Sequence, residues 1–388
     1  MSTPIAAPKP GAGVYADPER PINIIFVGAG AVGCFYASRL HHPDHNIHVS
    51  LLARSNYNAI IAANNTVTLQ THTFGDYLFH PVATYPNIAT AAASRVKWDY
   101  VIVTTKALPD RQDDSKTIEP LLKDNPDACI ILIQNGVGVE HPYRARFPRN
   151  PIVSGVTVIS AEQIRPGVIR QNRWTRMHLG PYTDSAAFEV DAGTVTGQGK
   201  LGDEERRRLN ELGMCHAKRL QDWWTRYGGI RDIKVTTEVG LQTVRWHKLT
   251  INAAFNPSAV LSGGRGNADM VLDAELRAHL KGVMDEIWAA APKILGNPKG
   301  FVEVDKETGE EKEMARPEQI LKSTERNVGS KPSMLLDWEA GRAMELEVIL
   351  GNPVRIARAK GVELPRVQTL YALLKSAQER RNKKKGKL

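Results

Sequence analysis

The amino-acid sequence predicts an α/β fold in two domains, a parallel-sheet domain first and an all-helical domain second. Three observations predict it. Short apolar runs of β type recur between residues 22 and 180, and the first of them leads into a glycine-rich motif. From about residue 236 onward the apolar residues follow helical spacing instead. The length of 388 residues is also more than one ordinary core needs.

The apolar run at 22–27 is followed by the motif GAGAVG and then by helical spacing. Gly28 permits a tight turn, Gly30 lets a ligand approach the backbone, and Gly33 lets helix and strand pack closely. The N–H groups at the start of the helix favour a pyrophosphate. Because the motif leaves a strand and opens a helix, it predicts a Rossmann-type dinucleotide-binding domain. The expected cofactor contacts are Gly28, Ala29, Gly30, Ala31, Val32 and Gly33.

The end of the second apolar run, IHVSLLAR, bears on which cofactor binds. A site for NAD usually presents an acidic residue there for the ribose hydroxyls, whereas this sequence has Arg54, 21 residues after Gly33. A guanidinium can bind a 2′-phosphate through two hydrogen bonds. The sequence therefore predicts NADP as the cofactor, with an exposed arginine at a strand end as the alternative.

Two further apolar runs end in polar residues, at Lys106 and at Asn135. Ligands of open parallel sheets bind outside the carboxyl ends of the strands, so both side chains are expected near the nicotinamide end of the cofactor. Asn135 is also a candidate for substrate contact. The segment 152–180 alternates like two strands joined at Arg165–Gly167, and 201–226 has the spacing of a charged helix.

The segment WHKLTINAAFNP carries Lys248, Asn252 and Asn256 at positions i, i+4 and i+8, which places them on one side of a helix. Apolar residues cover the neighbouring faces. The stripe faces either water or a cleft, where an ammonium and two carboxamides can bind and polarise a substrate. We expect Pro257 to end this helix, because proline lacks the N–H that an interior helical position uses.

The rest of the second half predicts further helices and an exposed, charged insertion at 300–316. We therefore expect four parts, with an active site in the cleft between the two domains. The first twenty residues lack an apolar signal core and the arginines of a transit peptide, so they are expected to be a disordered leader. The parts are the leader at 1–20, an NADP-binding Rossmann-like domain at 21–230, a helical substrate-binding and catalytic domain at 231–378, and a basic tail at 379–388.

Charge and cysteine content weigh against several other function classes. More than half of the net charge of +9 lies in residues 376–388, which we interpret as a frayed, solvated end. Neither nucleic acid nor a membrane is therefore expected as a partner. The three cysteines lack metal-type spacing and indicate reduced thiols. The histidines of segment 41–48 are interpreted as part of a solvated loop, and no metal site is expected.

Reduced thiols favour a cytoplasmic location. Peroxisome and mitochondrion are the alternatives. The final residues, GKL, lack the serine that usually begins a peroxisomal address. Apolar helical segments such as 348–356 can serve as a core or as a dimer face, so a homodimer stays open.

Five motifs occur in an order and spacing that resemble the ketopantoate reductase family. They are GAGAVG, TTKA, QNGVG, WHKLTINAAFNP and KPSMLLDWEAGRAMELEVILG. The resemblance covers about 22–375, and VTTKALPD and SMLLDWEAGR are similar to fungal-type members. Many members have an asparagine three residues before the site serine, where this chain has Ser330, with Asn327 displaced.

The resemblance implies roles for individual residues. It makes Lys248 the catalytic lysine and Glu345 the acidic partner in the site. The other implied contacts are Asn252, Asn256 and Ser333 with the substrate, and Lys106 and Asn135 with the cofactor.

These roles agree with the chemistry of the residues. Hydride reduction of a 2-oxo acid develops negative charge on the carbonyl oxygen, which an ammonium can stabilise and protonate. The resemblance implies NADPH-dependent reduction of 2-dehydropantoate (ketopantoate) to (R)-pantoate, on the route to pantothenate and coenzyme A. The alternatives are a related reductase of another 2-oxo acid and a non-catalytic NADP-binding regulator.

Overall fold

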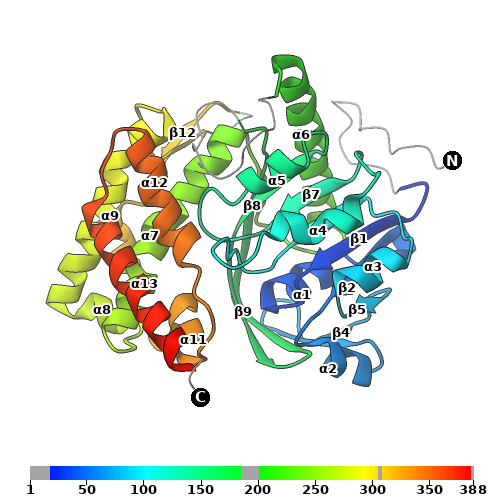
Figure 1. The fold of residues 1–388 in the computed structure, drawn as a ribbon, viewed down its shortest axis with the longest axis horizontal. Helices are drawn as coiled ribbons and strands as arrows, with labels where there is room; N and C mark the ends of the chain where they lie inside the picture. Colours follow the sequence, from blue (N-terminus) through cyan, green and yellow to red (C-terminus); the bar gives the residue numbers. More distant parts are fainter. Residues whose placement is uncertain (1–17, 185–200, 305–307, 386–388) are drawn as a thin grey trace.

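The computed structural model describes residues 18–184, 201–304 and 308–385. A mixed β-sheet with helices on its faces forms the first part, and a helical domain lies beside it (Figure 1). The predicted combination of an α/β domain with a helical second domain is confirmed. Residues 1–17 of the predicted leader and 386–388 of the predicted tail lie outside the described residues.

The N-terminal domain is built on a ten-stranded sheet with the order β4-β3-β9-β8-β7-β6-β1-β2-β5, and β10 pairs with β9. The central strands read as continuous apolar runs because both of their faces are covered. The strands are β1 Ile22–Val27, β2 Ile47–Leu52, β3 Val67–Thr71, β4 Tyr77–Phe79, β5 Thr84–Tyr85, β6 Tyr100–Val103, β7 Cys129–Leu132, β8 Ile152–Arg165, β9 Val168–Pro181 and β10 Ile233–Val235.

The helices of this domain connect the strands and cover the sheet (Figure 1). They are α1 Ala31–Ser38, the 3-10 turn Pro43–His45, α2 Tyr57–Ala62, α3 Ile88–Ala93, α4 Asp114–Leu122, α5 His141–Arg146 and α6 Asp203–Arg226. The predicted hairpin of β8 and β9 and the predicted helix at 201–226 are confirmed. Strand β10 follows residue 230, where we placed the domain boundary, yet it pairs with β9 of the first domain.

The C-terminal domain packs its helices around α7, which contacts α9, α11 and α13. No helix among the described residues is long and apolar enough to cross a membrane. The expected insertion forms a largely exposed hairpin of β11 Val302–Val304 and β12 Glu311–Glu313. The helices are α7 Glu238–Leu261, α8 Asn267–Leu272, α9 Ala274–Leu295, α10 Pro317–Thr324, α11 Ser333–Glu339, the π-helical turn Glu347–Gly351, α12 Asn352–Ala359 and α13 Pro365–Lys385.

The prediction that Pro257 ends its helix is wrong, because α7 continues to Leu261. A proline inside a helix removes one backbone hydrogen bond, but tertiary packing can outweigh that loss. Asn256, Pro257 and Ser258 are all buried, and the Ser258 hydroxyl donates to the carbonyl of Ala254 at 2.7 Å. Tertiary packing therefore stabilises α7 enough for the helix to continue past Pro257.

The prediction of a frayed end over residues 376–388 is wrong as far as Lys385, because α13 runs to that residue. Arg381 contacts α11 and the residues that follow it. Its guanidinium lies 4.3 Å from the ring centroid of Trp338 and donates to the carbonyls of Trp338 and Arg342. Cation–π contact and two hydrogen bonds therefore order part of a segment whose composition suggests only solvation.

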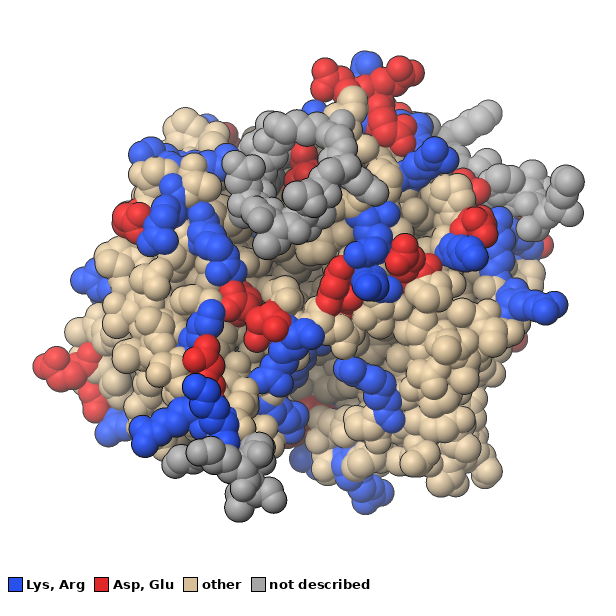
Figure 2. Space-filling view, viewed as in Figure 1, with Lys and Arg blue, Asp and Glu red and all other residues tan. Residues whose placement is uncertain are grey.

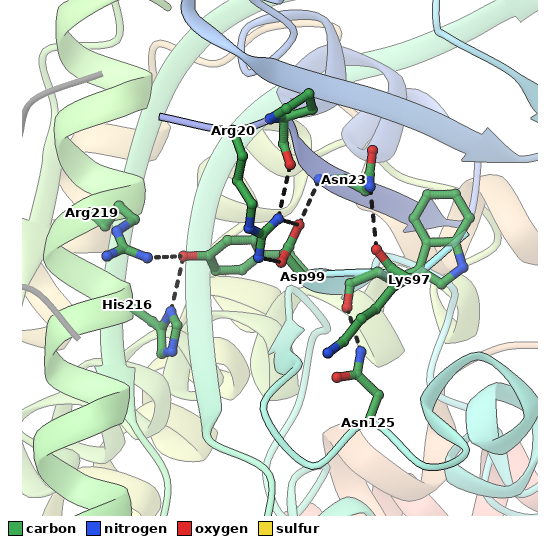
Figure 3. Close-up of polar contacts among 10 residues, drawn as sticks. Arg20, Asn23, Lys97, Asp99, Asn125, His216 and Arg219 are labelled. Carbon is green, nitrogen blue, oxygen red and sulfur yellow. Dashed lines mark hydrogen bonds and ion pairs between the residues drawn. The ribbon is translucent and has the colours of Figure 1, made fainter. Parts of the chain in front are cut away.

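A buried polar cluster lies at the N-terminal ends of β1 and β6, the edge of the sheet opposite to the glycine motif (Figure 3). Arg20 pairs with Asp99 at 2.8 Å, although it belongs to the expected leader. The Tyr100 hydroxyl contacts His216 Nδ1 at 2.9 Å and accepts from Arg219 at 3.4 Å. These contacts fix α6 against the sheet.

Candidate active site

The glycine motif forms the turn between β1 and α1. Gly28 has φ of +121°, and a Cβ on Gly33 would lie 1.9 Å from the Gly28 carbonyl oxygen, so both positions require glycine. Gly30 has open space where a Cβ would be, and no side chain caps α1. Backbone N–H groups and room for an anion therefore coincide at this helix start, as a pyrophosphate requires.

A cavity of about 450 Å³ opens beside this turn, at the carboxyl ends of β1, β2 and β6. Apolar side chains make much of its wall, and Arg54 lies at its edge with an exposed side chain. Its position at the carboxyl ends of the strands is where the adenosine half of a dinucleotide binds in folds of this kind. The residues that line it are Val27, Leu52, Arg54, Asn87, Ile88, Ala89, Val103, Thr105, Gln112, Asp114, Thr117 and Ile118.

Asp114 is a polar group of this cavity that the sequence did not single out. Burial raises the pKa of its carboxyl, although Thr105 and Gln134 donate hydrogen bonds to it and Arg54 lies near enough to oppose the shift. A carboxylate in an adenosine cavity can accept hydrogen bonds from an amino group. Its place at the start of α4, the helix that follows β6, is a signal that sequence reasoning could have used.

Lys248 lies on α7 and reaches into the N-terminal domain. Its ammonium donates to Asn135 Oδ1 at 2.8 Å and to the Thr157 carbonyl of β8 at 2.7 Å. The pKa of Lys248 is lowered to about 8, first by burial and then by the charge of Arg245, while the carboxylate of Glu345 opposes the shift. An ammonium whose pKa is near neutrality can both stabilise an anion and give up its proton.

Glu345 joins the same group from the C-terminal domain. Its side chain is 6% exposed and accepts hydrogen bonds from the Ala107 amide at 3.0 Å and the Asn135 amide at 3.5 Å. Burial raises the pKa of this carboxyl. Asn135 therefore bridges Lys248 and Glu345, so the structure brings these three expected site residues together.

Lys106 lies beside this group but contacts a residue that sequence reasoning missed. Its ammonium forms an ion pair with Asp337 of α11, a side chain that also pairs with Arg342 at 3.0 Å. The pair links the two domains. Figure 2 shows lysine and arginine side chains on both sides of the hollow between the domains.

Asn252 and Asn256 follow Lys248 along α7. Asn252 is partly buried, whereas Asn256 is 4% exposed and its Nδ2 has no hydrogen-bond partner among the described residues. A buried donor without a protein partner costs free energy, and a water or a ligand can supply the missing acceptor. Ser333 is exposed at the first position of α11, which packs against α7. No hydrogen bond joins Ser333 to Lys248 among the described residues.

Asn267 is a further polar residue that sequence reasoning missed. Its backbone N–H donates to the Ser330 carbonyl at 2.9 Å, and its side chain donates to the Ser330 hydroxyl at 3.3 Å. Its Oδ1 is buried without a partner in the described part of the chain. Ser330 stands where many family members have an asparagine. The missing asparagine was a signal to look for another asparagine near this position, as Asn267 is.

Comparisons with known proteins agree with this arrangement. Residues 24–184 match the family model described as Ketopantoate reductase PanE/ApbA, and residues 240–378 match its companion, Ketopantoate reductase PanE/ApbA C terminal. A Saccharomyces cerevisiae protein, Uncharacterized protein YDL144C, is 28% identical over 385 residues, which cover 94% of this chain and 96% of that protein. This relative agrees with the resemblance to fungal-type members.

Two further relatives have descriptions that include an activity. The 2-dehydropantoate 2-reductase of a Nostoc species is 25% identical and covers 92% of this chain and 95% of its own length. The crystal structure of 2-dehydropantoate 2-reductase from Methylococcus capsulatus has a TM-score of 0.68 at 30% identity, covering 93% of this chain and 98% of that one. With both family models matched in order over most of its length, the chain belongs to the ketopantoate reductase family, whose members are nicotinamide-dependent oxidoreductases acting on CH–OH groups.

Proposed function

We propose that this chain uses NADPH to reduce 2-dehydropantoate to (R)-pantoate. The observation that carries the proposal is the Lys248 ammonium, held at 2.8 Å by Asn135 where the helical domain meets the carboxyl edge of the sheet. The relatives from Nostoc and Methylococcus carry the name of this activity. Lys248 then acts as the general acid, and Glu345 as the acidic partner.

A reduced nicotinamide cofactor, when bound, would supply the hydride that reduces the carbonyl carbon of the 2-oxo acid. Lys248 stabilises the negative charge that develops on the carbonyl oxygen and transfers its proton to that oxygen, which yields the hydroxyl of the product. Asn135 holds the ammonium in place, and Glu345 orients Asn135 by accepting its amide at 3.5 Å. Asn252, Asn256 and Ser333 are the proposed contacts for the substrate's polar groups.

We propose NADP as the cofactor because of Arg54. No acidic residue stands at the end of β2, and the guanidinium lies at the edge of the adenosine-sized cavity. Lys106 and Asn135 are the proposed contacts near the nicotinamide, so Lys106 must exchange its ion pair with Asp337 when the cofactor enters. A variant Arg54→Glu should lose preference for NADPH over NADH, since it restores the acidic residue of NAD sites.

The test is cofactor oxidation with NADPH and with NADH, each offered 2-dehydropantoate beside straight-chain, branched and aromatic 2-oxo acids. Turnover of 2-dehydropantoate with NADPH, absent in Lys248→Ala, supports the proposal. Turnover of another 2-oxo acid in its place supports a related reductase, the second candidate, which the Ser330 departure favours. NADPH binding without turnover of any acid contradicts the proposal and leaves the regulator alternative.

Two further expectations stay proposals. We propose the cytoplasm as the location, because the buried thiols of Cys34 and Cys129 form no disulfide among the described residues, as in a reducing compartment. We also propose a homodimer, which sedimentation at several protein concentrations tests. A single concentration-independent species with the mass of one chain contradicts the homodimer.

A further inference from the structure

The backbone turn that carries Asn135 is held from both sides by the C-terminal domain. On one side Gly136, with φ of +86°, leaves no room for a Cβ, which would lie 2.4 Å from the Val348 carbonyl oxygen. The same carbonyl accepts from the Val137 amide at 2.9 Å. On the other side lies Arg245 of α7, whose side chain is 2% exposed. The turn therefore fits between α7 and the π-helical turn.

Arg245 contacts the residues on both sides of Asn135. Its Nη1 donates to the carbonyls of Gln134 at 3.0 Å and Gly136 at 2.8 Å. Its Nη2 donates to the Ser154 hydroxyl at 2.6 Å. One planar guanidinium thus joins the loop after β7 to strand β8, in a geometry that the point charge of a lysine cannot reproduce.

A buried carboxylate balances this guanidinium. Glu140 is 1% exposed, and its Oε1 forms an ion pair with Arg245 Nε at 3.0 Å. The geometry of this contact is not that of a hydrogen bond. The same oxygen accepts from Ser154 at 2.7 Å and from Gln242 at 3.2 Å. A buried ion pair contributes little net stability, but removing one partner leaves an uncompensated charge. The Arg245–Glu140 pair is therefore better explained by the orientation that it gives the guanidinium than by a contribution to the stability of the fold.

We propose that Arg245 is a positioning residue, which holds the Gln134–Gly136 turn so that Asn135 Oδ1 receives the ammonium of Lys248. Arg245 lies three residues before Lys248 on the same helix, so a single rigid element presents both the lysine and the clamp that fixes its partner. The inference rests on the proposed role of Lys248 as general acid. It adds a residue for which the family resemblance implies no role.

The charge of Arg245 has a second consequence for the same lysine. It is a cause of the lowered pKa of Lys248, after burial, while the carboxylate of Glu345 acts in the opposite direction. The other groups that face the lysine, Asn135 and the Thr157 carbonyl, are neutral. Lys106 and Asp337 act on Glu345 with opposite signs. Loss of the Arg245 charge should therefore raise the pH at which Lys248 titrates.

The experiment compares Arg245→Lys with a matched control, Arg144→Lys. Arg144 is 4% exposed and likewise donates to loop carbonyls, those of Phe147, Asn150 and Tyr182, but it does not contact Asn135. We expect Arg245→Lys to lower kcat by about 10- to 100-fold, since small misplacements of catalytic groups cost that much. NADPH affinity should change by less than kcat does, because Asn135 is only one of several proposed cofactor contacts and Arg245 is none of them. Arg144→Lys should keep kcat while losing similar thermal stability.

A second variant and a second readout separate the outcomes. The double variant Arg245→Met/Glu140→Gln removes both charges of the ion pair at once, so no unpaired charge is left buried. The readout is the pH dependence of Lys248 labelling by an amine-specific reagent, followed in its peptide by mass spectrometry, which needs no turnover. The midpoint should rise above its wild-type position of about 8 in the double variant and stay near it in Arg245→Lys.

Equal kcat losses in Arg245→Lys and Arg144→Lys would overturn the positioning role, as would an unchanged labelling profile in the double variant. If the wild type reduces no 2-oxo acid, the proposed function fails. The labelling profile then still decides whether Arg245 sets the state of Lys248, so the two failures are distinguishable.

Discussion

Two buried polar regions lie at opposite edges of the same sheet, and they have much in common. At the amino edge, burial lowers the pKa of His216 to about 3, and at the carboxyl edge burial lowers the pKa of Lys248 to about 8. Each region also has a buried amide atom with no partner in the described ranges, Asn125 Oδ1 in the first and Asn256 Nδ2 in the second. By burial and shifted pKa alone, both would be candidate sites.

The partners of the shifted groups separate the two regions. His216 contacts Tyr100 of its own domain, beside a cavity of only about 80 Å³ (Figure 3). Lys248 instead reaches from one domain to Asn135 of the other, along the edge where the cavity of about 450 Å³ opens. A shifted pKa therefore indicates function here only where groups from both domains converge at the edge that has space for a ligand.

The largest expected effect, a loss of kcat, tests whether the two edges of the sheet differ in function. Lys248→Met should lower kcat by about 10³- to 10⁴-fold, since it removes the proposed general acid. The matched change at the other edge, His216→Phe, should leave kcat within about twofold, because His216 contacts no proposed site residue. Steady-state kinetics with saturating NADPH measures both. Similar losses in the two variants would contradict the assignment of function to one edge only.

Much of this comparison could be predicted from the sequence. The turn at Gly28 and Gly33 follows from local backbone requirements, so the dinucleotide-binding fold could be predicted from the sequence alone. The stripe of Lys248, Asn252 and Asn256 follows from helical periodicity, which is also local. Local sequence pattern therefore predicted the sheet domain and the helix that faces it.

The contacts between distant segments could not be predicted in this way. The pairing of Lys106 with Asp337 and the contact of Asn267 with Ser330 depend on how helices pack, which periodicity does not encode. Packing also carried α7 through Pro257, against the local rule. The site residues that sequence reasoning missed are those whose partners lie on another element.

The second effect is on stability at alkaline pH. Lys248 titrates near 8 in the folded chain and near 10.5 when unfolded, so the unfolded chain binds more protons between these values. Stability from this group should therefore rise with pH across that window, by at most about 3 kcal/mol. Denaturant unfolding of wild type and Lys248→Met at a series of pH values measures it. The difference between the two should change across the window, and a constant difference would contradict the lowered pKa.

A smaller effect is expected at Asn256, where function and stability should separate. Asn256→Leu removes a buried donor without a partner, so the free energy of unfolding should stay the same or rise by about 1 kcal/mol. The KM for the 2-oxo acid should rise by about 10- to 100-fold, because the substrate loses one polar contact. Thermal unfolding and substrate titration give the two values. A destabilised variant with normal KM would show that Asn256 is a structural residue.

The smallest effect tests the amino edge itself. Tyr100→Phe removes a hydroxyl that contacts His216 Nδ1 at 2.9 Å and accepts from Arg219 at 3.4 Å. Because burial raises the pKa of Tyr100 to about 12, the hydroxyl stays neutral and only a hydrogen bond is lost. The free energy of unfolding should fall by about 1 kcal/mol, with kcat and KM unchanged. Unchanged kinetics would make this edge a stabilising element alone. A lower kcat in the fully folded variant would instead mean that strain at one end of β6 reaches Lys106 at the other, and the two edges would no longer be independent.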